Sequence, residues 1–216
     1  MGHDISDVDP LHFLKNNDAI ANFGKLDYLL KDGMHIQNYD SYTNQFLFLT
    51  KYYPDLKKYY ETYFGISLFE RGEGTKRYYF IDFNSSSRGN IPDSSRAFMK
   101  NKYIIIGLIL HKVKEIDRYV ELDSIEAFKN IVKNDYENYK PGLIKLIAKS
   151  DNTSIKGSDD DDKISNTIDN AFKRFKSVGW VYFKDDYFEL RPSFNRLIVL
   201  YEDVINTIDE RLNDLK

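Results

Sequence analysis

Four consecutive aspartates, Asp159 to Asp162, form the densest group of possible metal ligands in this chain of 216 residues. A calcium loop needs oxygen ligands at alternating positions and a glycine at a fixed offset, and the stretch DDDDK has neither. Successive side chains of a helix point about 100° apart, so four neighbouring carboxylates cannot all face one ion. We therefore interpret the aspartates as the start of a helix, where they satisfy free backbone amides, and we predict no metal site and no cofactor.

Other residues that could carry catalysis are scattered or missing. The chain has no cysteine, which excludes thiolate zinc sites and cysteine nucleophiles. The stretch GEGTKR lacks the glycine and lysine spacing of a phosphate-binding loop and fits a hairpin turn. The histidines show no pairing at metal-ligand spacing; they are His3, His12, His35 and His111. We therefore predict a protein that is not an enzyme and has no catalytic residues.

A group of cations lies further along the helix that the aspartates begin. Lys163, Lys173 and Arg174 fall outside the apolar stripe of this helix, and Lys176 follows them. The stripe, spaced at three and four residues and ended by Gly179, comprises Ile164, Ile168, Ala171, Phe172, Phe175 and Val178. Two interpretations stay open. The cations could contact DNA, or they could complement the negative end of the helix and keep its surface solvated.

The overall charge and hydropathy limit the choice of partners. A net charge of -3 cannot attract a polyanion over a distance, so a nucleic acid would need a local basic patch. The longest apolar run, YIIIGLIL at 103–110, is far shorter than a membrane span, and the N-terminus has no apolar signal segment. We therefore expect a cytoplasmic protein with no membrane partner.

The elements around the aspartate helix follow an order that occurs twice. In the first half, the spacing predicts helices over 18–30, 41–51 and 54–64, a short extended piece after Gly33, and a hairpin within 65–83. In the second half, it predicts helices over 94–116, 125–134 and 141–150, the aspartate helix, a short strand at 118–122, a hairpin at 180–190 and a final helix from about Ser193. Helix, short strand, helices and hairpin is the order of a winged-helix module, in which the helix before the hairpin can lie against DNA.

We therefore predict a mainly α fold with small β-hairpins (α+β), built from tandem winged-helix domains. The predicted division is an N-terminal tail at 1–17, a first domain at 18–84, a linker at 85–92, a second domain at 93–192 and a C-terminal helix at 193–216. The alternative is one irregular helical domain with two incidental hairpins.

Several segments resemble one known family. The segment GSDDDDKISNTIDNAFKRFKSVGWVYF, residues 157–183, is similar to the corresponding segment of the MukE and MksE family. The segments DGMHIQ, YYFIDF and SSSRGNIPDSSRAFMKNKYIIIGLIL resemble its Gly-x-His-Ile motif, its hairpin strand, and its linker with central helix. The resemblance implies a non-enzymatic, homodimeric subunit of a bacterial SMC (condensin) complex that binds a MukF/MksF-like kleisin and, through it, a MukB/MksB-like SMC ATPase. It implies a role in chromosome organisation and segregation, or in plasmid defence.

The resemblance also indicates which cations would face DNA. It places Lys163, Arg174 and Lys176 at or near basic positions of the family, and helix geometry adds Lys156 and Lys173. Because a serine, Ser177, stands where a further basic residue is common, we expect weak, nonspecific DNA binding by a nucleoid-associated protein. The alternative is a tandem winged-helix transcription regulator, but the helix that would read base edges begins with aspartates, which phosphates repel.

The predicted final helix carries a long apolar stripe. Such a stripe indicates packing into the core or against another subunit. It comprises Phe194, Leu197, Ile198, Tyr201, Val204, Ile205, Ile208, Leu212 and Leu215.

Overall fold

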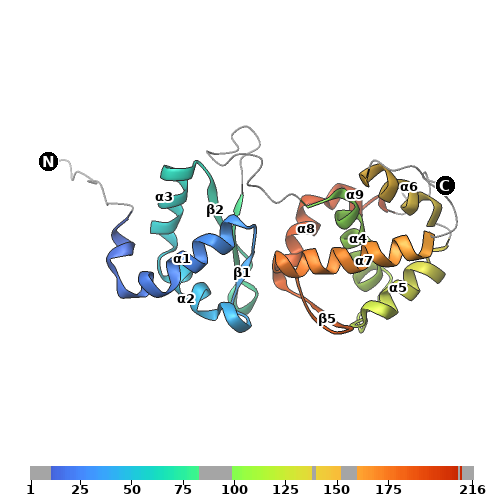
Figure 1. Cartoon of the computed structure of the whole chain (residues 1–216), viewed down its shortest axis with the longest axis horizontal. Coiled ribbons are helices and arrows are strands. Elements are labelled where there is room, and N and C mark those ends of the chain that lie inside the picture. Colours follow the sequence, from blue (N-terminus) through green and yellow to red (C-terminus); the bar gives the residue numbers. More distant parts are fainter. Residues whose placement is uncertain (1–10, 83–98, 138–139, 152–159, 209, 211–216) are drawn as a thin grey trace. The chain divides into compact units, whose positions relative to one another are not determined.

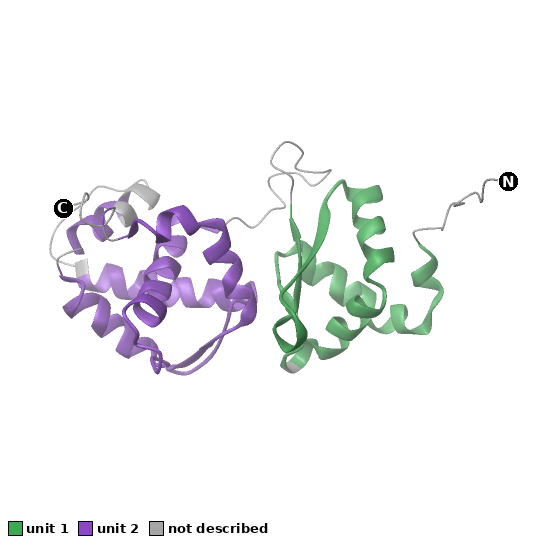
Figure 2. Cartoon of the chain, turned by 180° about the vertical axis from the view of Figure 1, so that it is seen from behind, with its two compact units in different colours: residues 1–97 green, residues 98–216 purple. Residues whose placement is uncertain are grey.

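A computed structural model of the chain describes residues 11–82, 99–137, 140–151, 160–208 and 210 (Figure 1). Contacts within the chain define two compact units, residues 1–97 and residues 98–216 (Figure 2). The described residues form mainly helices together with small antiparallel sheets, which confirms the predicted mainly α fold with small β-hairpins. No helix in the described part of the chain is long and apolar enough to cross a membrane.

Unit 1 packs three helices against one face of a small sheet. After a 3₁₀ turn its elements are α1 (Asn17–Lys31), β1 (Ile36–Gln37), α2 (Thr43–Lys51), α3 (Tyr53–Phe64), β2 (Ser67–Arg71) and β3 (Tyr78–Asp82). The strand order is β1-β3-β2, and both pairings are antiparallel, with Ile36 opposite Tyr79 and Phe69 opposite Phe80. The first short strand of the unit therefore pairs with its last strand.

The core of unit 1 explains why these helices stop and pack where they do. Leu26 and Leu30 of α1 and Tyr60 of α3 are fully buried, and the Tyr60 hydroxyl donates a hydrogen bond to Asp27 Oδ1 at 3.0 Å. Helix α3 ends at Gly65, whose φ of 62° is the left-handed conformation that glycine adopts without strain. The chain can then turn directly into β2.

Unit 2 surrounds one central helix, α4, with other helices and a hairpin. Its elements are α4 (Asn101–His111), a π-helical turn (Lys112–Ile116), α5 (Ile125–Asn134), α6 (Lys140–Asp151), α7 (Asp160–Ser177), β4 (Val181–Lys184), β5 (Tyr187–Leu190), α8 (Asn195–Leu200) and α9 (Glu202–Ile205). Strands β4 and β5 pair antiparallel, with Lys184 opposite Tyr187 beside the two-residue turn. On its other side, β5 makes an isolated bridge from Tyr187 to Ser124.

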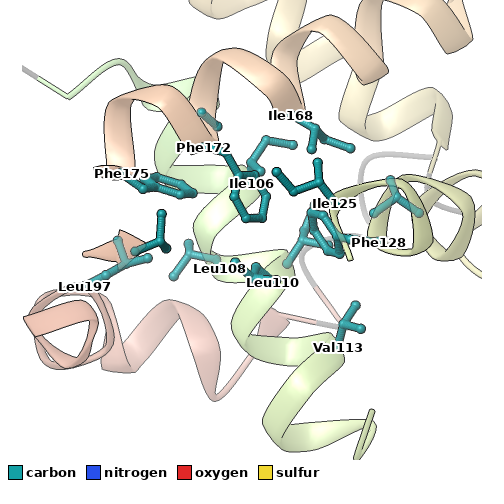
Figure 3. Close-up of a cluster of buried hydrophobic side chains, with 14 of the residues drawn as sticks. Ile106, Leu108, Leu110, Val113, Ile125, Phe128, Ile168, Phe172, Phe175 and Leu197 are labelled. Atoms are coloured by element: carbon teal, nitrogen blue, oxygen red, sulfur yellow. The ribbon is translucent and has the colours of Figure 1, made fainter. Parts of the chain in front are cut away.

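The core of unit 2 forms where α7 and α8 pack on α4. Phe172 and Phe175 of α7 and Leu197 of α8 are at most 1% exposed and lie around the α4 side chains (Figure 3). A Cβ at Gly107 of α4 would lie 2.5 Å from Leu197 Cδ2 and 3.2 Å from Phe175 Cζ, so the glycine lets both neighbours come close. All six residues of the predicted α7 stripe are buried, which confirms that prediction.

Three predicted elements differ in the structure. The helix predicted over 94–116 is described from residue 99, begins at Asn101, and has a π-helical last turn at Lys112–Ile116. The segment 118–122, predicted as a strand, forms a turn in which Arg118 has a φ of 64°. Lys114 Nζ donates hydrogen bonds to the carbonyl oxygens of Val120 (3.0 Å) and Leu122 (2.5 Å), so the turn satisfies backbone groups that a strand would have paired. The extended residue that pairs with β5 is Ser124, just beyond the predicted strand.

The final helix is interrupted at Tyr201, where φ is -123° and ψ is 27°, between α8 and α9. Phe194, Leu197, Ile205 and Ile208 belong to the core of unit 2 itself, so this part of the apolar stripe packs within the chain. The rest of the stripe beyond residue 210 lies outside the described residues.

Candidate nucleic-acid interface

Helix α7 begins within the run of aspartates. Asp160 is its first residue, as the interpretation of the run as a helix start predicted, and Asp159 lies outside the described residues. The Asp161 carboxylate forms an ion pair with Lys140 of α6, and this hydrogen bond lowers the pKa of Asp161. Within the described residues, no three histidine, aspartate or glutamate side chains gather in a way that could hold a metal ion. At this end of α7, the Asp161 carboxylate therefore contacts α6.

A second acid of α7 is also engaged by a lysine. Lys129 of α5, whose side chain is 9% exposed, binds Asp169 Oδ1 at 2.8 Å and Glu126 Oε1 at 2.6 Å. Burial alone would lower the pKa of Lys129, but the hydrogen bonds to Asp169 and Glu126 raise it overall. Lys129 therefore stays charged and balances Asp169, so this acid adds little negative field to the outer face of α7.

The outer face of α7 carries two of the predicted DNA contacts in line. Lys163 and Arg174 are eleven residues apart, which places them about 20° apart around the helix and roughly 16 Å apart along it. Lys173 lies close to the middle of the exposed face and is itself exposed. Lys156 lies outside the described residues. Three of the five predicted cations, Lys163, Lys173 and Arg174, therefore share one outer face.

Ser177 forms two hydrogen bonds with Arg174 at the C-terminal end of this face. Arg174 donates from an Nη atom to Ser177 Oγ at 3.0 Å, and Ser177 Oγ donates to the Arg174 carbonyl oxygen at 2.8 Å. Ser177 therefore orients the guanidinium of Arg174 at the last turn of α7.

Lys176 lies about 60° around the helix from Lys173, on the side away from Lys163 and Arg174, and its side chain contacts the hairpin. Its Nζ donates to the Phe183 carbonyl oxygen of β4 at 3.0 Å and lies 4.6 Å from the centre of the Phe183 ring. It lies about 140° around the helix from Lys163. The structure thus joins Lys176 to the hairpin and does not bring it into line with Lys163 and Arg174.

The hairpin contributes cations that the sequence analysis did not select. The Arg191 guanidinium lies 5.3 Å from the centre of the Tyr182 ring, and Lys176 Nζ lies 6.0 Å from it. Tyr182 alternates with the buried Val181, and Lys184 shares its side of β4. This period of two was the signal available in the sequence, since it predicts that Tyr182 and Lys184 face away from the core.

The acidic turn of the hairpin is fixed to the start of α5. Asp186 Oδ2 accepts a hydrogen bond from Ser124 Oγ at 2.5 Å, and Asp186 Oδ1 accepts one from the Glu126 backbone amide at 2.8 Å. These bonds lower the pKa of Asp186. Ser124 Oγ also accepts a hydrogen bond from the Ala127 amide at 2.9 Å. Ser124 and Asp186 together cap α5, so the tip of the hairpin is held against its own unit.

One comparison identifies the family of the chain. A family model described as condensin complex protein MksE matches residues 21–202. The chain belongs to the MksE family. The matched range runs from within α1 to the first residue of α9 and includes the candidate interface between Lys163 and Arg191. The match confirms the resemblance to the MukE and MksE family, and no curated protein matches the chain.

Proposed function

We propose that this condensin accessory subunit is non-enzymatic, binds a MukF/MksF-like kleisin, and reaches a MukB/MksB-like SMC ATPase through it. The observation that carries the proposal is the MksE match across 21–202, which spans both units. In this role the chain is a cytoplasmic, nucleoid-associated homodimer that assists DNA capture. Chromosome segregation and plasmid defence are both compatible with the family, and the genes beside this one would separate the two.

We propose further that each unit is a winged-helix module. Helix, short extended segment, helices and hairpin follow in that order in both units, and the short segment pairs with the last strand in both. This shared connectivity supports tandem domains at 18–84 and 93–192 joined by a linker at 85–92. In unit 2 it makes α7 the helix before the hairpin, the position that lies against DNA in such modules.

The outer face of α7 supports weak DNA contact. Lys163, Lys173 and Arg174 share it, while Asp161 and Asp169 are balanced by lysines of neighbouring helices. About four phosphate contacts would give a salt slope near -3.6, so affinity would fall roughly a hundredfold between 50 and 200 mM salt. The cations of the last turn also lie at the C-terminal end of α7, where the negative end of the helix dipole repels a phosphate. DNA binding therefore depends on the assembled complex.

The test is DNA capture by the complete complex containing the double variant Lys173→Glu and Arg174→Glu. We expect capture to fall severalfold while the complex still assembles. A matched control reverses two exposed lysines of unit 1, Lys57→Glu and Lys76→Glu, and should leave capture unchanged. Equal capture by both double variants would remove α7 from the DNA interface, and selection of one short operator sequence by the chain alone would favour the regulator instead.

A further inference from the structure

Helix α1 presents an apolar face to solvent. Ile20 is 84% exposed and Tyr28 is 69% exposed, and the exposed Ala21 and Gly24 lie between them. The opposite side of α1 supplies Leu26 and Leu30 to the core of unit 1, so this helix is apolar on two sides. Single exposed apolar residues are ordinary on a surface, but an aligned group over two turns marks an interaction site.

Packing within the described part of unit 1 does not require Gly24. It lies in the middle of α1, where glycine destabilises a helix relative to alanine. A Cβ at this position would meet no atom of the described residues within 4 Å. A requirement from outside the chain, such as the close approach of another helix, would explain it.

The spacing of the face identifies that other helix. Ile20 and Tyr28 lie four residues before and four residues after Gly24, on one ridge of the helix. A two-fold axis that passes beside Gly24 would therefore place Ile20 of each copy against Tyr28 of the other. Each glycine would let the other backbone come close. We propose that α1 is the self-association surface of the chain and pairs antiparallel with α1 of a second copy.

The helix dipoles favour the antiparallel orientation. Asp18 in the first turn of α1 is ion-paired with Lys51 of α2, and Lys31 in its last turn is ion-paired with Asp27, so both charges are engaged within their own chain. Antiparallel pairing brings opposite helix ends together, so the two helix dipoles attract each other, whereas a parallel pair would bring like ends together.

The size of the face sets the strength of the contact. One helix face of this length exposes on the order of a few hundred Å² of apolar surface, less than the roughly 800 Å² that each partner buries in a standard interface. We therefore expect a dimer whose population depends on concentration. This inference rests on the homodimer of the proposed function and assigns its surface.

Crosslinking of the full chain gives the first test. Because the chain has no cysteine, Gly24→Cys introduces one thiol per chain at a position with space for its side chain. A short bis-maleimide should then link two copies efficiently. The control is Leu47→Cys on α2, also exposed at 56%, which should stay uncrosslinked. Equal crosslinking of the two variants would overturn the inference.

A charge exchange gives the second test, measured by sedimentation equilibrium. Ile20→Lys and Tyr28→Glu should each weaken the dimer at least tenfold, because each places a charge against an apolar side chain. The double variant should recover most of the affinity, since every introduced lysine then faces an introduced glutamate. Failure of the double variant to recover would overturn the antiparallel arrangement.

Two further outcomes separate this inference from the proposed function. A wild-type dimer that all three variants leave intact would overturn the α1 surface and leave the homodimer standing. A chain that remains monomeric at every concentration would overturn both the surface and the homodimer. Kleisin binding, measured separately, would stand in either case.

Discussion

The Asp186 carboxylate of the β4–β5 turn accepts a hydrogen bond from the Ser124 hydroxyl at 2.5 Å, although 62 residues separate the two in sequence. With the amide of Glu126 bound as well, Asp186 acts as a capping carboxylate supplied to α5 from a distant hairpin. The relationship gives the acidic turn a structural role that is independent of DNA.

We expect Asp186→Asn to destabilise the protein by about 1 kcal/mol at pH 7, because it removes a charged partner of the α5 amides. The pKa of Asp186 is lowered in the folded protein, so its contribution is present above the unfolded-state value of about 3.9 and is lost as pH falls through the lower folded value. Urea unfolding at pH 7 and pH 3 should therefore show a difference at pH 7 that shrinks at pH 3. Asp185→Asn is the matched control, and an equal loss in both variants would count against the cap.

Lys176 and Lys173 should respond differently to loss of charge. Lys173→Met removes an exposed cation of the outer face, so the salt slope of DNA capture by the complex should become shallower by about 0.9. Lys176→Met removes the bond to the Phe183 carbonyl oxygen, so capture should weaken with the slope unchanged. Capture titrations at several salt concentrations measure both. If Lys176→Met also reduced the slope, Lys176 would be a phosphate contact.

The glycine of α4 and the glycine of α1 should tolerate alanine to different degrees. Gly107→Ala forces a methyl group against the buried Leu197 and Phe175 and should destabilise the chain by about 1 to 2 kcal/mol. Gly24→Ala enters open space and should stabilise the isolated chain by up to about 1 kcal/mol through helix propensity. Denaturant unfolding at low protein concentration compares the two. If Gly107→Ala stabilised the chain instead, α7 and α8 would not pack against α4 as closely as described.

In unit 1, Tyr60→Phe should cost about 1 kcal/mol. The substitution keeps the buried ring but removes the donor to Asp27 Oδ1, and Asp27 then keeps its ion pair with Lys31. Burial and the neighbouring Asp27 raise the pKa of Tyr60, so the loss should be independent of pH between 6 and about 9. Tyr59→Phe, which changes a half-buried neighbour, should be close to neutral in the same unfolding experiment.

The periodic parts of the fold could be predicted from the sequence. The α7 stripe, both hairpins and the start of α7 at the aspartates follow from spacing within one segment, because helices and strands repeat at fixed periods. The turn at 118–122 could not be predicted in this way. Lys114 binds its backbone carbonyl oxygens, and because every residue has such an oxygen, the sequence carries no signal for these hydrogen bonds.

The candidate site was also only partly predictable from the sequence. Helical geometry predicted that Lys163, Lys173 and Arg174 share a face. It could not show that Lys176 binds β4 or that Asp186 caps α5, because both bonds join segments whose relative placement depends on the packed core. The grouping of Lys176 and Arg191 around the Tyr182 ring was overlooked for the same reason, because it appears once the hairpin lies beside α7.

The central position of α4 bears on the order in which the chain matures during synthesis. Unit 1 completes its sheet at Asp82, so its folding can finish while much of the chain has yet to be made. Unit 2 needs Leu197 of α8 to pack against Gly107, so its apolar helix α4 stays partly uncovered until residue 197 has left the ribosome. During that interval the apolar side chains of α4 are open to a chaperone.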